Sequence, residues 1–132
     1  MQLDSAPQVL YVEDDRINIV LMEEVFRRLP GWQLICAESG AEAMELLKSQ
    51  PLPQLLLIDM NLPDTNGLAL FQQVRAQAHC AALRCIALSA DDQAEQVHAA
   101  LQAGFGDYWA KPIDVTRFVS LLQQDLAAQA SR

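Results

Sequence analysis

The sequence has no apolar run long enough to cross a membrane, which would need roughly 18 residues. Its first residues, Met1–Asp4, lack the basic region of a signal peptide. Basic residues are scarce, because nine lysines and arginines stand against seventeen acids, for a net charge of −8. Nucleic acids and anionic lipids both attract clustered Lys and Arg. We therefore expect an acidic, soluble, cytoplasmic chain with no direct contact to nucleic acid or membrane.

Cysteines and glycine-rich loops are also few. The three cysteines, Cys36, Cys80 and Cys85, form no CxxC pair and have no cluster of histidines beside them, which disfavours a zinc site or a redox dithiol. We predict that Cys36 and Cys85 are buried or half-buried, since both lie in apolar runs. The sequence neither requires nor excludes a disulfide between Cys80 and Cys85. Neither GxxxxGK[ST] nor GxGxxG occurs, which disfavours a nucleotide-binding domain.

What the chain does contain is a regular alternation of two kinds of segment, within a length that fits one domain. Short apolar runs predict five strands, at Gln8–Glu13, Gln33–Glu38, Gln54–Asp59, Cys85–Ser89 and Asp107–Lys111. Apolar residues at helical spacing follow each run, and the two clearest stripes are Met22, Val25, Phe26, Leu29 and Val115, Phe118, Val119, Leu122, Leu126. This alternation predicts an α/β fold, with five parallel strands and five helices covering both faces of the sheet.

Several predicted helix ends carry the expected signals. Ser39 and Glu42 form a capping-box pattern, and Asp114 precedes the last apolar stripe as an N-cap. Pro30-Gly31 is expected to end the first helix, and Gly104 the fourth.

Polar residues gather where the predicted strands end. They are Glu13-Asp14-Asp15, Asp59, Ser89 and Lys111-Pro112. Each alone is explained as a cap, a turn or a surface residue, and we interpret Asp15 as a helix-start or surface residue. All four sets lie at the carboxyl edge of one parallel sheet, however, which is where such sheets bind ligands. Their conjunction therefore predicts a functional site.

The chemistry of these residue types is specific. Carboxylates held close together repel one another and need a cation, and oxygen ligands partly open to water suit Mg²⁺. A further carboxylate can attack phosphorus to give an acyl phosphate. The charge on the transferred phosphoryl group then needs a metal, an ammonium and a hydroxyl donor. Aspartate and glutamate supply carboxylates for attack and for binding the metal, lysine supplies the ammonium, and serine supplies the hydroxyl.

The stretches VLYVEDDRIN, LLLIDMNLPDTNG, ALSAD and GFGDYWAKPID resemble, in order and spacing, the motifs of response-regulator receiver domains of two-component signalling. The resemblance is strongest to the receivers of hybrid histidine kinases. It covers a core of about residues 8–127, and we predict a single domain over residues 1–132. It implies a flavodoxin-like, three-layer αβα fold with strand order 2-1-3-4-5.

The resemblance also implies a metal site. Asp59 matches the phosphoacceptor, and Glu13 and Asp14 match the acidic pair that holds Mg²⁺, for which Mn²⁺ can substitute. Asp14 would bind the ion directly, together with Asp59, and Glu13 would act through water. The backbone carbonyl of Asn61 would be the third protein ligand.

Two further positions match residues that act on the phosphoryl group, and a third matches a switch residue. Ser89 matches the hydroxyl that meets it, and Lys111 matches the lysine that binds it. Tyr108 matches the aromatic switch residue, and the peptide bond before Pro112 is expected to be cis. Asn61 and Asp91 occupy the positions that tune dephosphorylation.

The implied function is to accept a phosphoryl group from a phosphohistidine, on a histidine kinase or a histidine phosphotransfer protein. Phosphorylation would switch the face formed by the fourth helix, the fifth strand and the fifth helix. That face would control a partner or an output domain, fused or separate, or a phosphorylation-dependent dimer. Such a domain promotes its own phosphorylation and dephosphorylation but is a signalling module, not an enzyme. A stand-alone relay and a receiver from a longer chain both fit, with a slight preference for the second.

Two alternative functions fit the sequence less well. A pseudo-receiver, acting as an interaction module without phosphorylation, usually lacks one member of the residue set that is complete here. An aspartyl-phosphate phosphatase needs a second aspartate two residues after the first, where this chain has Asn61. We also expect Glu13, Asp14 and Asp59 to repel one another without metal, so that Asp14→Asn stabilises the metal-free fold.

Overall fold

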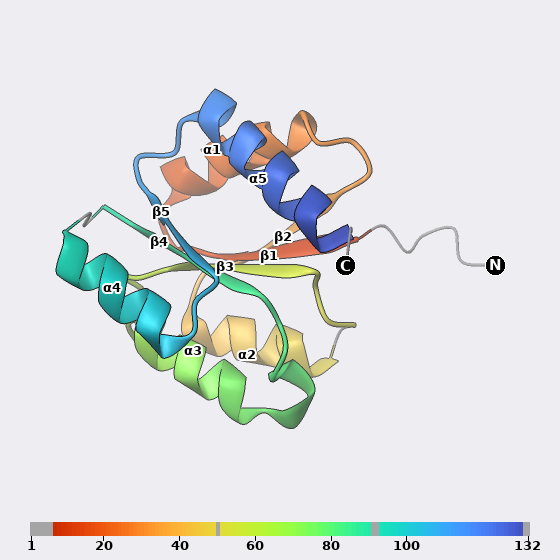
Figure 1. The fold of residues 1–132 in the computed structure, drawn as a ribbon. Coiled ribbons are helices and arrows are strands. Elements are labelled where there is room, and N and C mark those ends of the chain that lie inside the picture. The colour runs from red at the N-terminus through yellow and green to blue at the C-terminus, as the bar shows by residue number, and fades with distance from the viewer. Residues whose placement is uncertain (1–6, 50, 91–92, 131–132) are drawn as a thin grey trace.

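Five parallel strands form one sheet between two layers of helices (Figure 1). The computed structural model describes residues 7–49, 51–90 and 93–130. The strands are β1 (Gln8–Val12), β2 (Gln33–Ala37), β3 (Leu55–Asp59), β4 (Cys85–Ser89) and β5 (Asp107–Ala110), in the order β2-β1-β3-β4-β5. The predicted α/β class and strand order 2-1-3-4-5 are confirmed.

The helices alternate with the strands, as predicted. They are α1 (Arg16–Arg27), α2 (Gly40–Ser49), α3 (Gly67–Ala76), α4 (Ala94–Ala103) and α5 (Val115–Ala130), with a short 3₁₀ turn, η1 (Ala78–Cys80), before β4. Helices α1 and α5 cover one face of the sheet, and α2, α3 and α4 cover the other (Figure 1). In the part of the chain that the structure describes, none of these helices is both long and apolar enough to span a membrane.

Each face of the sheet carries its own hydrophobic core. Every residue of β3 and β4 is buried, because helices cover both sides of these central strands. The predicted stripe of α1 buries Met22, Val25 and Phe26 against the sheet, and that of α5 buries Phe118 and Leu122. Fully burying such side chains contributes about 1.5–3 kcal/mol each. The two cores therefore hold the strands in a fixed register.

The predicted helix caps are present. The Ser39 hydroxyl accepts a hydrogen bond from the Glu42 N–H (3.1 Å), although the Glu42 carboxylate accepts from the Glu38 N–H instead of that of Ser39. Asp114 accepts from the Arg117 N–H (2.9 Å). Gly104 ends α4 with a φ of +119°, a conformation that favours glycine.

Two more predictions concern the first helix and the cysteines. Helix α1 ends at Arg27, shortly before Pro30-Gly31, as expected. Cys36 is half-buried and Cys85 is buried, as predicted. All three cysteines are free, so Cys80 and Cys85 form no bridge.

The strand register brings the predicted site residues to one edge. Val12 pairs with Ile58 across β1 and β3, and Asp59 pairs with Leu88 across β3 and β4. Strands β1 and β5 end one residue earlier than predicted, so that Glu13 and Lys111 lie just beyond them.

Candidate functional site

Three carboxylates meet at the carboxyl edge of the sheet. Oxygens of Glu13, Asp14 and Asp59 all lie within 4.8 Å of one another. Glu13 and Asp59 are only 1% and 3% exposed, whereas Asp14 is open to solvent. Two buried carboxylates and one open carboxylate therefore form a single acidic cluster.

Lys111 places its ammonium between the two buried carboxylates. Its Nζ lies 3.0 Å from Glu13 Oε1 and 3.2 Å from Asp59 Oδ1. Lys111 follows β5 directly, and its N–H donates to the Ser89 carbonyl (2.9 Å), which fixes the start of the side chain. The peptide bond between Lys111 and Pro112 is cis, as predicted.

Burial and proximity shift the pKa values of these three groups. Burial, together with the hydrogen bond and the charge of Glu13, raises the pKa of Asp59 to about 6. Burial also opposes the ionised form of Glu13, but hydrogen bonds with Asp59, Tyr11 and Lys111 outweigh it and lower the Glu13 pKa. Burial would lower the pKa of Lys111, yet its two carboxylate partners raise it. Near neutral pH, Lys111 is thus a cation, and Asp59 takes up a proton more readily than Glu13.

Glu13 has two further donors that the sequence analysis did not identify. The Tyr11 hydroxyl donates to Glu13 Oε1 (2.7 Å), and the Asp15 N–H donates to Glu13 Oε2 (3.2 Å). Tyr11 and Glu13 are two residues apart and therefore project from the same side of the chain. That spacing could have revealed the pair, but Tyr11 is part of the apolar run of β1. Asp15 is the N-cap of α1, in agreement with its predicted role.

The loop after Asp59 is closed on itself. The Asn61 N–H donates to Asp59 Oδ1 (3.2 Å), and Asn61 forms an isolated bridge with Asn66. The Gly67 N–H donates to the Met60 carbonyl (3.0 Å). A Cβ at Gly67 would lie 2.8 Å from the Met60 Cα, so only glycine permits this approach. Asn61, the predicted carbonyl ligand, is thereby held next to the acidic cluster.

The tip of the same loop is attached to α2. Asp64 accepts hydrogen bonds from the N–H groups of Gly40 (2.9 Å) and Ala41 (3.0 Å), and these donors lower its pKa. A Cβ at Gly40 would lie 2.7 Å from Thr65 Cγ2, which explains the glycine. This contact was not predicted from the sequence, because it joins residues 23 and 24 positions apart.

Ser89 and Tyr108 lie beside the cluster, toward α4. Ser89 is buried at the end of β4, and Tyr108 is half-buried on β5. Both line an open groove of about 390 Å³, together with Met60, Asn61, Asn66, Leu68, Gln96, Ala99 and Ala100. Asp91 lies outside the described residues. The structure thus places the two predicted switch residues around one groove next to the acidic cluster.

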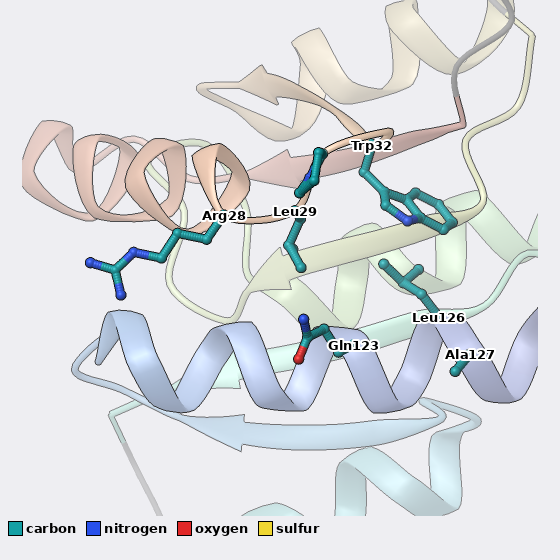
Figure 2. Close-up of a pocket in the computed structure, with 7 residues that line it drawn as sticks. Arg28, Leu29, Trp32, Gln123, Leu126 and Ala127 are labelled. Carbon is teal, nitrogen blue, oxygen red and sulfur yellow. The ribbon is translucent and has the colours of Figure 1, made fainter.

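A second groove, of about 430 Å³, lies between the end of α1 and the last turns of α5 (Figure 2). Leu29, Trp32 and Leu126 supply its apolar walls, and Arg28 and Gln123 supply its polar groups. It is at the opposite end of α1 from the carboxylates. It adds no group to the acidic cluster.

The donor set of the cluster fits a hard divalent cation. Carboxylate oxygens with one side open to water are the ligands that Mg²⁺ prefers. The single ammonium of Lys111 compensates only one of the buried negative charges. A cation at this edge would therefore be stabilised both by its ligands and by the uncompensated charge.

Comparison with known proteins identifies the family. The response regulator receiver domain matches residues 9–123. The chain belongs to this family. Receiver domains act in two-component systems, where they interact with histidine kinases and output domains and bind Mg²⁺.

Individual relatives span very different lengths. An uncharacterized 14.6 kDa protein of Leptolyngbya boryana is 34% identical over 124 residues, covering 94% of this chain and 93% of its own length. The DNA-binding transcriptional regulator NtrC of Escherichia coli is 35% identical over 121 residues, which cover 90% of this receiver but only 25% of NtrC. A solved response regulator receiver protein of Pseudomonas putida is 28% identical with a TM-score of 0.78, covering 92% of this chain and 99% of that one.

Proposed function

We propose that this chain is a single receiver domain, residues 1–132 with a core of about 8–127, whose phosphoacceptor is Asp59. The donor is a phosphohistidine on a histidine kinase or a histidine phosphotransfer protein. The observation that carries the proposal is the Lys111 ammonium, held between Glu13 and Asp59 at the edge of an acidic cluster. We place the exchange in the cytoplasm, a reducing compartment that is compatible with the three free cysteines.

The residues that would hold Mg²⁺, or Mn²⁺ in its place, are those of the acidic cluster and its loop. Asp14 and Asp59 would be direct ligands, Glu13 would act through water, and the Asn61 carbonyl would complete the protein ligands. Bound Mg²⁺ supplies positive charge to the oxygens of the transferred phosphoryl group.

Asp59 performs the covalent step. One of its carboxylate oxygens attacks phosphorus and forms an acyl phosphate, while the P–N bond of the phosphohistidine breaks and its electron pair stays on the histidine nitrogen. A pKa of about 6 leaves most of the Asp59 carboxyl ionised, and therefore nucleophilic, at pH 7. Lys111 is already in contact with Asp59 and can pair with the new phosphoryl oxygens.

The output step involves Ser89 and Tyr108. A phosphoryl oxygen on Asp59 offers an acceptor to the Ser89 hydroxyl, and a hydrogen bond to a charged acceptor contributes about 1.5–3 kcal/mol. Movement of Ser89 would change the groove that it shares with Tyr108 and so bias the face of α4, β5 and α5. That face would control a partner, a fused or separate output domain, or a phosphorylation-dependent dimer. The domain promotes its own phosphorylation and dephosphorylation but remains a signalling module.

Incubation with acetyl phosphate tests the proposal. Intact-protein mass spectrometry should show one added phosphoryl group with Mg²⁺ and none with EDTA. Ser89→Ala should still be phosphorylated, but NMR shifts on the face of α4, β5 and α5 should respond less to beryllofluoride than in the native protein. If the native protein takes up no phosphoryl group with Mg²⁺, the pseudo-receiver interpretation replaces this one.

A further inference from the structure

Tyr11 carries a hydroxyl into an otherwise apolar layer. The residue is the last but one of β1, is 0% exposed, and belongs to the core beneath α1 and α5 that also contains Met22 and Phe118. Its hydroxyl donates to Glu13 Oε1 at 2.7 Å. Phenylalanine would fill the same space without a polar atom, and a buried hydroxyl without a partner is destabilising. The tyrosine is therefore explained by its hydrogen bond rather than by packing.

The two carboxylate oxygens of Glu13 accept hydrogen bonds from different donors. Oε1 accepts from the Tyr11 hydroxyl and from Lys111 Nζ, whereas Oε2 accepts from the Asp15 N–H at the start of α1. Donors on both oxygens prevent the carboxylate from rotating. One of these donors, Lys111, also contacts Asp59 and would shift toward a phosphoryl group formed there. When it does, Tyr11 is the remaining side-chain donor to Oε1 among these contacts.

The pair also depends on the length of the glutamate. Tyr11 and Glu13 lie on the same side of one strand, about 6.6 Å apart along its axis. The side chain of an aspartate is shorter by one carbon–carbon bond, about 1.5 Å. An aspartate carboxylate at position 13 would lie too far from a hydroxyl that now makes a contact of 2.7 Å. The hydroxyl is therefore matched to glutamate.

We propose that Tyr11 is a positioning residue for the acidic cluster: its hydroxyl holds Glu13 in the orientation that supports Mg²⁺, and so sets the metal affinity and the rate at which Asp59 is phosphorylated. This inference rests on the proposed function. Outer groups that orient the direct ligands of a metal typically change affinity or activity 10–100-fold when they are removed, and because Glu13 acts through water we expect the lower end of that range.

Tyr11→Phe removes only the hydroxyl, and Glu13→Asp supplies the matched background. Four proteins are compared: native, Tyr11→Phe, Glu13→Asp and the double variant. Mg²⁺ affinity is measured by calorimetric titration, phosphorylation rate with acetyl phosphate, and the melting midpoint in EDTA. Circular dichroism verifies that each protein is folded.

With Glu13 present, Tyr11→Phe should weaken Mg²⁺ binding about tenfold, slow phosphorylation and lower the melting midpoint in EDTA. In the Glu13→Asp background the same substitution should change Mg²⁺ affinity less than about twofold, because the hydroxyl no longer reaches the carboxylate. This difference between the backgrounds is a readout that a purely structural role would not produce.

Two results would overturn the inference. Equal losses in both backgrounds would mean that the hydroxyl acts through general packing. A fall in the melting midpoint without any change in Mg²⁺ affinity would mean that the hydrogen bond is structural only. Failure of the proposed function itself is seen separately, because the native protein would then neither bind Mg²⁺ nor accept a phosphoryl group.

Discussion

Lys111 is one cation between two buried carboxylates, Glu13 and Asp59. The second negative charge is left without an equal partner, and a buried charge of this kind is destabilising. Burial, and then the hydrogen bond and charge of Glu13, raise the pKa of Asp59 to about 6. The site is therefore arranged to take up positive charge, from a proton, a metal ion or both.

This imbalance predicts a pH dependence for the metal-free protein. The pKa of Asp59 rises from 3.8 when unfolded to about 6 in the fold, so the folded state binds the proton more tightly. Its contribution to stability is fully present below pH 3.8 and is lost as pH rises through about 6. The loss is about 1–3 kcal/mol. The lowered pKa of Glu13 acts in the opposite direction, but only below its ordinary value of 4.5.

Asp59→Asn should abolish this dependence. In EDTA, its melting midpoint should exceed that of the native protein above pH 6 and approach it near pH 4.5. Parallel curves for the two proteins across this range would contradict the expectation. Asp14, whose neutralisation the sequence predicts to be stabilising, is exposed, so we expect a smaller gain from Asp14→Asn than from Asp59→Asn.

At the scale of the elements, hydrogen bonds fix the β3–α3 loop at its base and at its tip. Hydrogen bonds around Asn61 and Gly67 close its base, and Asp64 joins its tip to the first turn of α2. The loop that carries the predicted Asn61 carbonyl ligand is thus supported by α2, which packs over β1 and β2 on the same face of the sheet as α3.

Asp64→Ala should free this loop. It removes the acceptor for two N–H groups of the first turn of α2, so we expect the melting midpoint to fall by a few degrees and Mg²⁺ affinity to weaken. Asp64→Asn keeps one acceptor oxygen and should lose less. Thermal melts and Mg²⁺ titrations measure both effects, with Glu45→Ala, at an exposed ion pair of α2, as the control. If Asp64→Ala melts no lower than Glu45→Ala does, the contact does not support the loop.

The elements themselves could be predicted from the sequence. Strands β3 and β4 are buried on both faces and appear as continuous apolar runs, and the stripes of α1 and α5 match the faces that they bury. Parallel alternation with helices then requires the strand ends to meet at one edge.

The side-chain contacts of the site could be predicted only in part. Asp59, Glu13 and Lys111 follow strands, so their proximity follows from topology. The contact of Asp64 with α2 depends on how two loops approach each other, which no local pattern encodes. The hydrogen bond from Tyr11 to Glu13 was not predicted, because Tyr11 lies in an apolar run and its ring has the hydrophobicity of a core residue.

At the scale of the whole molecule, the two helical layers hold the strands so that one edge collects negative charge, in a chain that is already acidic. A ligand that binds this edge only in the folded state stabilises the fold by RT ln(1 + [L]/Kd). Asp59 lies far in sequence from the adjacent Glu13 and Asp14, so the unfolded chain does not hold the three carboxylates together and should bind Mg²⁺ weakly.

Mg²⁺ should therefore raise the melting midpoint of the native protein. At ten times Kd the gain is about 1.4 kcal/mol, which corresponds to about 3–6 °C for a domain of this size. NaCl at the same ionic strength provides the control for screening. An equal rise with Na⁺ would mean that the acidic cluster is not a metal site.

The most direct measurement locates the phosphoryl group. The protein is treated with acetyl phosphate and Mg²⁺ and then with borohydride, which reduces an aspartyl phosphate to homoserine, and its peptides are sequenced by tandem mass spectrometry. We expect homoserine at position 59 alone, and none in Asp59→Asn or in EDTA. Homoserine at Asp14 or another acid, or a phosphoryl adduct that persists in Asp59→Asn, would contradict it.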